Sequence, residues 1–316
     1  MAANKQMPPI ERTTVRRRVA RALGWAAKAV GIVLVVILVV VAGGAAYLRS
    51  ESGLAQLARL VEWLASSEQS SLTIGRLEGA FPEHLRLENV SLSDQQGTLV
   101  SLDYAELRWR PWRLLSGHLA VTVFDIGIVD VTRLPAVEPA PEQEAGPMAL
   151  PSLPVDVNLD AFRLRELRLG EAIAGQPARL TATASLSATR EGEFAAEADV
   201  HRLDGVATRV SLTAGFDKST EHLKIDVQAD EPGGGIVASL LSLPGAPPLH
   251  LQAKGEGPLR DWRGRLEAAA GDVAGINANV RLSGEKPLRV ALDGRAEVQG
   301  LLPPDLAPLT AGGAAI

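Results

Sequence analysis

The sequence predicts a mainly β protein that is tethered to a membrane by one N-terminal helix. The run from residue 29 to residue 48 contains no charged residue, and its 20 residues match the thickness of a bilayer's hydrocarbon core. After residue 72, apolar and polar residues alternate with a period of two, which is typical of half-buried strands. Strands that recur without intervening helical runs favour an antiparallel or meandering sheet over alternating strands and helices.

Composition limits the chemistry that is available. The 316 residues are 46% hydrophobic and only 4% aromatic, so any core is built mainly from Ala, Leu and Val. The absence of cysteine excludes disulfides, thiolate nucleophiles and cysteine metal sites.

The first 28 residues form a basic tail with seven cations and one anion, a balance of +6 that leaves −11 for the rest of a chain whose net charge is −5. By the positive-inside rule this tail is cytoplasmic, and everything after the anchor at 29–48 lies across the membrane, in the periplasm of a bacterium. Because the exported body is acidic and repels phosphates, nucleic acid is not expected as a partner. The alternative to the anchor is a cleaved signal peptide, because Ala42, Gly44 and Ala46 provide small residues at a suitable spacing for cleavage. Both alternatives place the rest of the chain across the membrane.

A short amphipathic helix is predicted over residues 49–71, because Leu54, Leu57, Val61 and Leu64 recur at helical spacing. We expect its apolar side to cover the end of the following sheet.

The remaining chain divides at a segment rich in proline. Residues 134–154 contain six prolines and three glutamates and read as an extended loop. They separate a first β segment, 72–133, from a second, 155–316, whose clearest strand is 178–186. The turn-rich closing residues predict a frayed terminus or a chain cut short.

No catalytic or metal-binding pattern is found. The five histidines are scattered, and nucleophile elbows, phosphate loops and paired metal ligands are missing. We therefore expect no enzyme activity, no cofactor and no metal.

The order of these segments resembles the TamB family of translocation and assembly module proteins, within the AsmA-like group. The resemblance is carried by the basic start and anchor, by LTIGRLEGAFPEHLRLENVSLSD (72–94), by an LxWxPxxLL run, and by LLPPDLAPL (301–309). The run comprises Leu107, Trp109, Pro111, Leu114 and Leu115.

This resemblance implies an elongated, curled sheet, the β-taco, with an apolar groove that carries phospholipid from the inner towards the outer membrane. It also implies a role in outer-membrane protein and autotransporter assembly with a TamA-like barrel. The C-terminal domain that meets this barrel has no counterpart in these 316 residues. The resemblance therefore implies the barrel partner for full-length family members and not for this chain.

The alternating apolar residues are the candidates for the groove. They are Leu85, Leu87, Leu107, Trp109, Leu119, Val121, Val123, Leu180, Ala182, Leu186, Leu223, Ile225, Val227, Leu249, Leu251, Val280, Leu288 and Val290. The same residues could instead fill a closed β-sandwich, which would favour a membrane-tethered scaffold or binding module without lipid transport.

Overall fold

The computed structural model describes residue 59 and residues 70–133, 153–241, 243–284, 289–297 and 314–315. The predicted tail (1–28) and anchor (29–48) lie outside the described residues. Of the predicted helix at 49–71, Arg59 is helical, whereas Ser70 and Ser71 already belong to the first strand. Within the described ranges, no helix combines the length and the apolarity needed to cross a bilayer.

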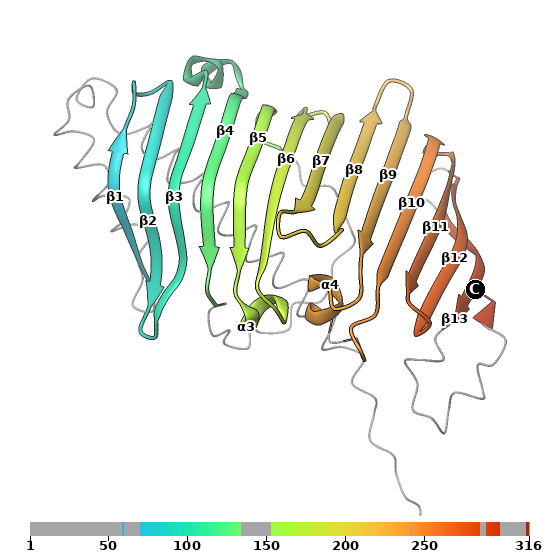
Figure 1. Ribbon diagram of the computed structural model, residues 1–316. Coiled ribbons are helices and arrows are strands. Elements are labelled where there is room, and N and C mark those ends of the chain that lie inside the picture. Colours follow the sequence, from blue (N-terminus) through green and yellow to red (C-terminus); the bar gives the residue numbers. More distant parts are fainter. Residues whose placement is uncertain are drawn as a thin grey trace, which may run out of the picture.

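One sheet of 14 strands makes up the body, and each strand lies beside the next along the chain (Figure 1). The first seven strands are β1 (Ser70–Glu78), β2 (His84–Asp94), β3 (Gly97–Trp109), β4 (His118–Val131), β5 (Asp156–Leu169), β6 (Ala178–Ala188) and β7 (Phe194–Arg202). The others are β8 (Arg209–Asp217), β9 (His222–Glu231), β10 (Leu249–Pro258), β11 (Asp261–Ala270), β12 (Ala274–Ser283), β13 (Arg289–Glu297) and the two-residue β14 (Ala314–Ala315).

Three short helices interrupt this order. A 3-10 helix, η1 (Pro111–Ser116), joins β3 to β4, α3 (Glu171–Ala174) joins β5 to β6, and α4 (Ile236–Leu240) joins β9 to β10. Gly117, which ends η1, adopts a positive φ of 78° that favours glycine.

The prediction of a wholly antiparallel sheet is wrong at one place, because β4 and β5 are parallel, from the pair His118 and Asp156 to the pair Val131 and Leu169. A parallel pair needs a connection of a dozen or more residues that returns the chain to the end where the first strand began. The proline-rich segment 134–154 occupies this connection. The two predicted β segments thus contribute to one continuous sheet.

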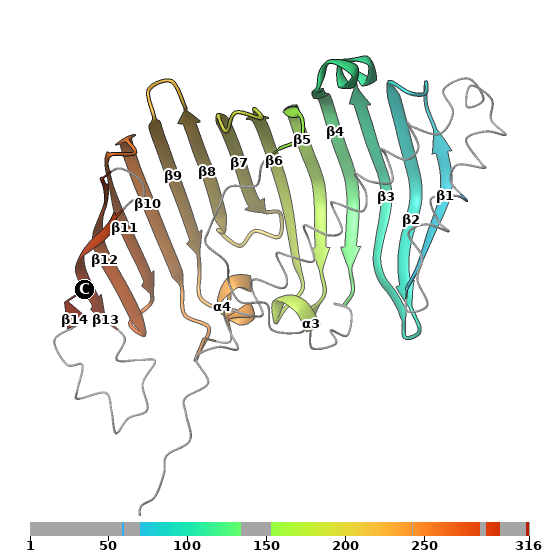
Figure 2. The ribbon, with the colours of Figure 1, turned by 180° about the vertical axis from the view of Figure 1, so that it is seen from behind.

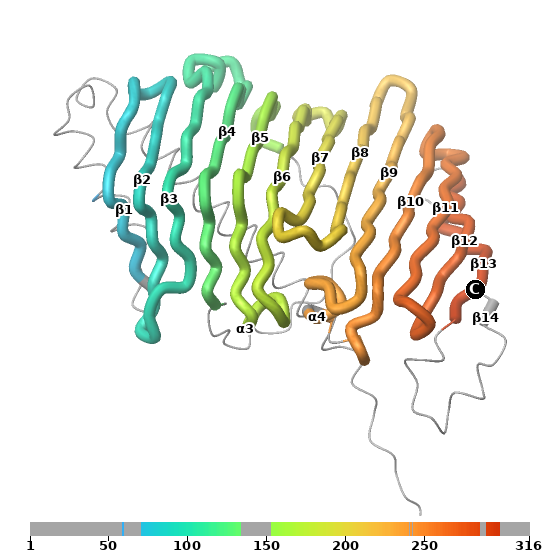
Figure 3. The backbone as a smooth tube through the Cα atoms, viewed as in Figure 1, coloured from blue at the N-terminus to red at the C-terminus, as the bar shows by residue number. Residues whose placement is uncertain are grey.

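The described strands form a single layer that does not close. All of them belong to the same sheet, so the part of the chain that the structure describes contains no second sheet to complete a sandwich. The reverse view shows β1 and β13 far apart at opposite edges (Figure 2). Along the tube drawing, the strands change tilt progressively from β1 to β13, which gives the sheet its curl (Figure 3). The predicted curled, open β architecture is confirmed.

Candidate functional site: the apolar face of the sheet

The strand register assembles aliphatic residues into continuous rows across the sheet. Residues that are paired between neighbouring strands point to the same side, and neighbours within a strand point to opposite sides. Three such rows, A, B and C, lie on one side of the sheet, which we call the apolar face.

Each strand from β1 to β13 contributes one aliphatic residue to row A. Row A consists of Leu77, Leu87, Ala105, Ile126, Leu164, Ala182, Val200, Val210, Ala229, Leu251, Ala268, Ile276 and Ala296. Row B consists of Leu85, Leu107, Phe124, Phe162, Ala184, Ala198, Leu212, Val227, Ala253, Leu266, Ala278 and Gly294. Row C consists of Trp109, Val121, Leu159, Leu186, Ala196, Ala214, Ile225, Gly255, Gly264, Val280 and Leu292.

The opposite side of the sheet is polar. The row that lies between A and B in each strand consists of Arg86, Glu106, Asp125, Arg163, Thr183, Asp199, Ser211, Gln228, Gln252, Glu267, Asn277 and Arg295. None of its members is apolar. The sheet therefore separates a continuous apolar surface from a continuous polar one.

Most predicted groove residues lie on the apolar face, with two exceptions. Leu288 lies outside the described residues. Val123 is paired with Arg108 and therefore shares the polar side, whereas its neighbour Phe124 is paired with Leu107 in row B. The cause is a shift in register between Arg108 and Trp109, where β4 holds one extra residue and the alternation reverses.

Sequence reasoning missed several members of the rows, among them Phe124, Phe162, Leu164 and Leu212. A signal was present in the segment 121–126, where apolar residues stand at both odd and even positions. Such a break in alternation within a strand indicates a bulge.

Near β3 and β4 the apolar face is densely packed. Leu107, Trp109 and Val121 are 5%, 4% and 7% exposed, and Leu114, Leu119, Phe124 and Leu159 pack against them. The Trp109 indole N–H donates a hydrogen bond to the Pro82 carbonyl at 2.6 Å. The polar atom of this buried ring is therefore satisfied.

A second tryptophan, Trp262, fills the space in row C that is left by the glycines of β10 and β11. An added Cβ at Gly255 or Gly264 would collide with the ring of Trp262, so this ring lies across both glycines. Its N–H donates to the Leu223 carbonyl at 3.0 Å. The glycines thus make room for an aromatic ring that keeps row C apolar.

The apolar face opens to solvent at its far edge. Ile276 on β12 and Leu292 and Val290 on β13 are 37%, 49% and 62% exposed. The predicted candidates on earlier strands are buried or half-buried.

One end of the face carries a buried polar group. Arg202, paired with Leu180, has a side chain only 2% exposed and donates three hydrogen bonds to Asp204, at 2.6, 2.8 and 3.1 Å. The guanidinium lowers the pKa of the Asp204 carboxyl to about 2. The pair thus stays ionised and internally neutralised.

Two short helices cover this end. Ala174 of α3 and Ile236 of α4 pack with Ala178 of β6 into a buried cluster. The buried carboxylate of Glu231 accepts the backbone N–H groups of Ile236 and Val237 at 2.6 and 2.9 Å and so holds the start of α4. In Figure 1 both helices lie at the same end of the strands.

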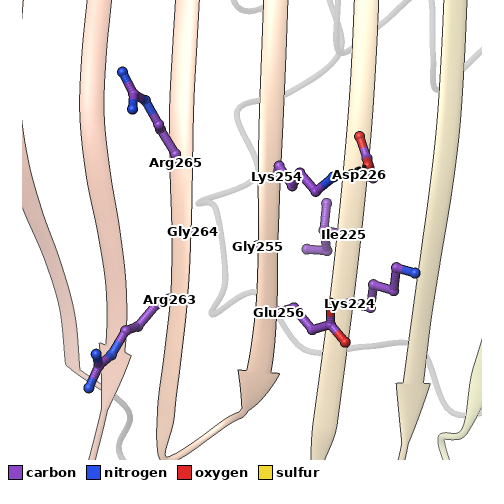
Figure 4. A pocket seen from close by; sticks show the side chains of 9 residues that line it. All are labelled: Lys224, Ile225, Asp226, Lys254, Gly255, Glu256, Arg263, Gly264 and Arg265. Carbon is purple, nitrogen blue, oxygen red and sulfur yellow. Dashed lines mark ion pairs between the residues drawn. The ribbon is translucent and has the colours of Figure 1, made fainter.

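Ion pairs within strands and between strands cover the polar side. Figure 4 shows a hollow over β9, β10 and β11 in which Lys254 lies 3.2 Å from Asp226, with Lys224, Arg263 and Arg265 nearby and no side chain at Gly255 or Gly264. Charges of both signs lie side by side here, as on a solvated surface. Within the described residues, no group of three potential metal ligands is found.

Comparison with known proteins agrees with the resemblance noted from the sequence. Residues 42–185 match the family described as TamB, N-terminal domain. No curated protein and no solved structure matches the chain. The matched residues include β1 to β5 and the first part of β6, up to residue 185, and so contain the densely packed region near β3 and β4. From its sequence match and its open curled sheet, this part of the chain is a TamB-like N-terminal portion.

Proposed function

We propose that this protein is anchored in the bacterial inner membrane, with its N-terminus in the cytoplasm and its body in the periplasm, and passes phospholipid along the apolar face towards the outer membrane. The observation that carries the proposal is the continuity of row A, which has an aliphatic residue on every strand from β1 to β13. The TamB N-terminal match supports a role in lipid transport or envelope assembly.

The rows fit an acyl chain in physical terms. Each CH₂ group that leaves an apolar environment costs about 0.8 kcal/mol, so a 16-carbon chain faces on the order of 12 kcal/mol in water. A row of apolar side chains that continues across the strands removes most of this barrier. Because the rows vary little in chemistry, no single position holds the lipid tightly.

Movement along such a surface needs no nucleotide, cofactor or catalytic residue, and we propose that the protein is not an enzyme. We further propose that lipid delivery supports outer-membrane protein assembly. A TamA-like barrel would then act at the outer membrane in the full-length system.

Bound lipid tests the proposal. We would purify the full chain without detergent, in lipid-preserving polymer, and count phospholipids per chain by mass spectrometry. Leu212→Asp places a charge in row B, whereas Thr213→Asp places the same charge one residue along β8, on the polar side opposite Asp226. We expect several-fold less bound phospholipid in Leu212→Asp than in Thr213→Asp. Both substitutions lower stability, the first by placing a charge on the apolar face and the second by facing Glu197 and Asp226, so the comparison is made on chains shown to be folded by circular dichroism.

A scaffold protein gives a different result. Equal phospholipid in the two variants and in the unchanged chain would favour a tethered scaffold or binding module and would contradict transport along the face.

A further inference from the structure

The 3-10 helix η1 forms a small projection beyond the ends of β3 and β4 (Figures 1 and 2). We call residues 110–117 the tip. It contains two of the most exposed large apolar side chains of the described residues, Trp112 at 60% and Leu115 at 87%. The lipid-carrying rows do not use them, although Leu115 belongs to the run that carries the family resemblance.

The period of the helix explains which side chains point outward. A 3-10 helix has three residues per turn, so residues three apart share a side. Pro111 and Leu114 share the inner side, where Pro111 is buried and Leu114 packs against the Trp109 cluster. Trp112 and Leu115 consequently share the outer side, and their exposure is a property of the backbone geometry.

Cations accompany this apolar pair. Arg110 and Arg113 are exposed and line one shallow hollow with Trp112 and Glu83, and within the described ranges neither arginine has an ion-pair partner within 4.0 Å. The ring N–H of Trp112 donates one long hydrogen bond of 3.4 Å to the Glu83 carboxylate. The exposed part of the tip thus combines an amphipathic ring and an aliphatic side chain on one side of the helix with two guanidinium groups on the neighbouring side.

We propose that the tip inserts into the surface of a bilayer that contains anionic phospholipid. Tryptophan favours the headgroup level, leucine the acyl boundary just below it, and exposed arginines the lipid phosphates. A stable protein interface needs about 20–30 residues on each side, far more than this helix presents. This docking is independent of lipid passage along the rows.

The lack of cysteine in the chain permits a direct depth measurement. Leu115→Cys, labelled with an environment-sensitive fluorophore, would be reconstituted as the full chain in vesicles of phosphatidylethanolamine and phosphatidylglycerol. Nitroxide-bearing lipids then quench a label that enters the bilayer. Glu191→Cys is the matched control, because its side chain is 76% exposed in the β6–β7 turn, next to Arg190, which contacts Gly117.

We expect several-fold stronger quenching at position 115 than at position 191, and loss of this difference in vesicles of phosphatidylcholine alone. Arg110→Gln with Arg113→Gln removes two charges, which should lower the ratio of docked to undocked tip by roughly 30-fold. Equal quenching at the two positions in anionic vesicles would overturn the proposal. So would a photocrosslinker at position 115 that captures protein and no lipid in cells.

These results are separable from those for lipid transport. The tip variants leave row B unchanged, so the phospholipid count of the purified chain tests transport whether or not the tip docks.

Discussion

Phe124 lies opposite Leu107 across the β3–β4 pair, and both contact the buried cluster that contains Trp109 and Val121. This pairing exists because the bulge near Thr122 reverses the side-chain alternation within β4. Without the extra residue, Phe124 would point to the polar side and Val123 would take its place. Row B is continuous through β4 only because the strand is irregular there.

Two identical substitutions on either side of the bulge test this geometry. Val121→Thr places a hydroxyl in the cluster around Trp109, where it finds no partner, and should lower the free energy of unfolding by about 2 kcal/mol. Val123→Thr places the same hydroxyl beside Arg108, and we expect a change within about 0.5 kcal/mol. Chemical denaturation measures both. Equal losses would mean that the bulge does not separate the two side chains.

Replacing either glycine under the Trp262 ring with a larger residue should lower the stability of the protein. Gly255→Ala places a methyl group where the ring lies and should cost about 1–3 kcal/mol through overpacking. In a Trp262→Ala background the same substitution should cost little, because the obstructing ring is gone. Gly275→Ala on β12 is the control, since its nearest neighbour is 3.9 Å away. A double-mutant cycle with no coupling between residues 255 and 262 would contradict the contact.

The Arg202–Asp204 pair predicts a specific dependence of stability on pH. The pKa of Asp204 falls from 3.8 to about 2 in the folded chain, so the ionised carboxylate contributes about 2 kcal/mol above pH 4, which is lost as the pH falls from 4 to 2. Asp204→Asn should therefore be destabilised at pH 7 by at least this amount, because Arg202 is buried without a partner. The deficit should shrink below pH 4.

Denaturation curves at pH 7 and at pH 2.5 would measure this difference. Asp261→Asn breaks an exposed pair with Arg263, whose side chains are 56% and 65% exposed, and should change stability by less than about 1 kcal/mol at either pH. If the Asp204→Asn deficit were the same at both pH values, the ion pair would not be its cause.

The sequence predicted the strands of the body well because a sheet with one apolar side imposes strict alternation. The run at 178–186 is an example, since Leu180 and Ala182 face the apolar side and Thr181 and Thr183 the other. Alternation fails at bulges, which depend on contacts between strands and not on the strand alone, so Val123 was misassigned. The parallel pairing of β4 with β5 depends on where a long connection ends, and no local pattern encodes that.

Some features of the face depend on distant partners. Arg202 stands in a strand that reads as polar and apolar in alternation, yet its side chain is buried and paired with Asp204 of the following connection, which the strand pattern does not encode. Likewise, the reason for Gly255 and Gly264 lies in another residue of the sheet, because the ring of Trp262 lies across both. Composition did indicate which side chains make up the apolar face. A chain with only 4% aromatic residues builds most of its rows from Leu, Val and Ala.

We propose that phospholipid moves along the apolar face of the sheet and not along the polar one. A photocrosslinking amino acid in place of Phe124 or Ala182 would project from rows B and A, and one in place of Val123 or Thr183 would project from the polar side. Transport along the face predicts that the first two positions capture phospholipid in cells and that their neighbours capture little. Equal capture at neighbouring positions would contradict it.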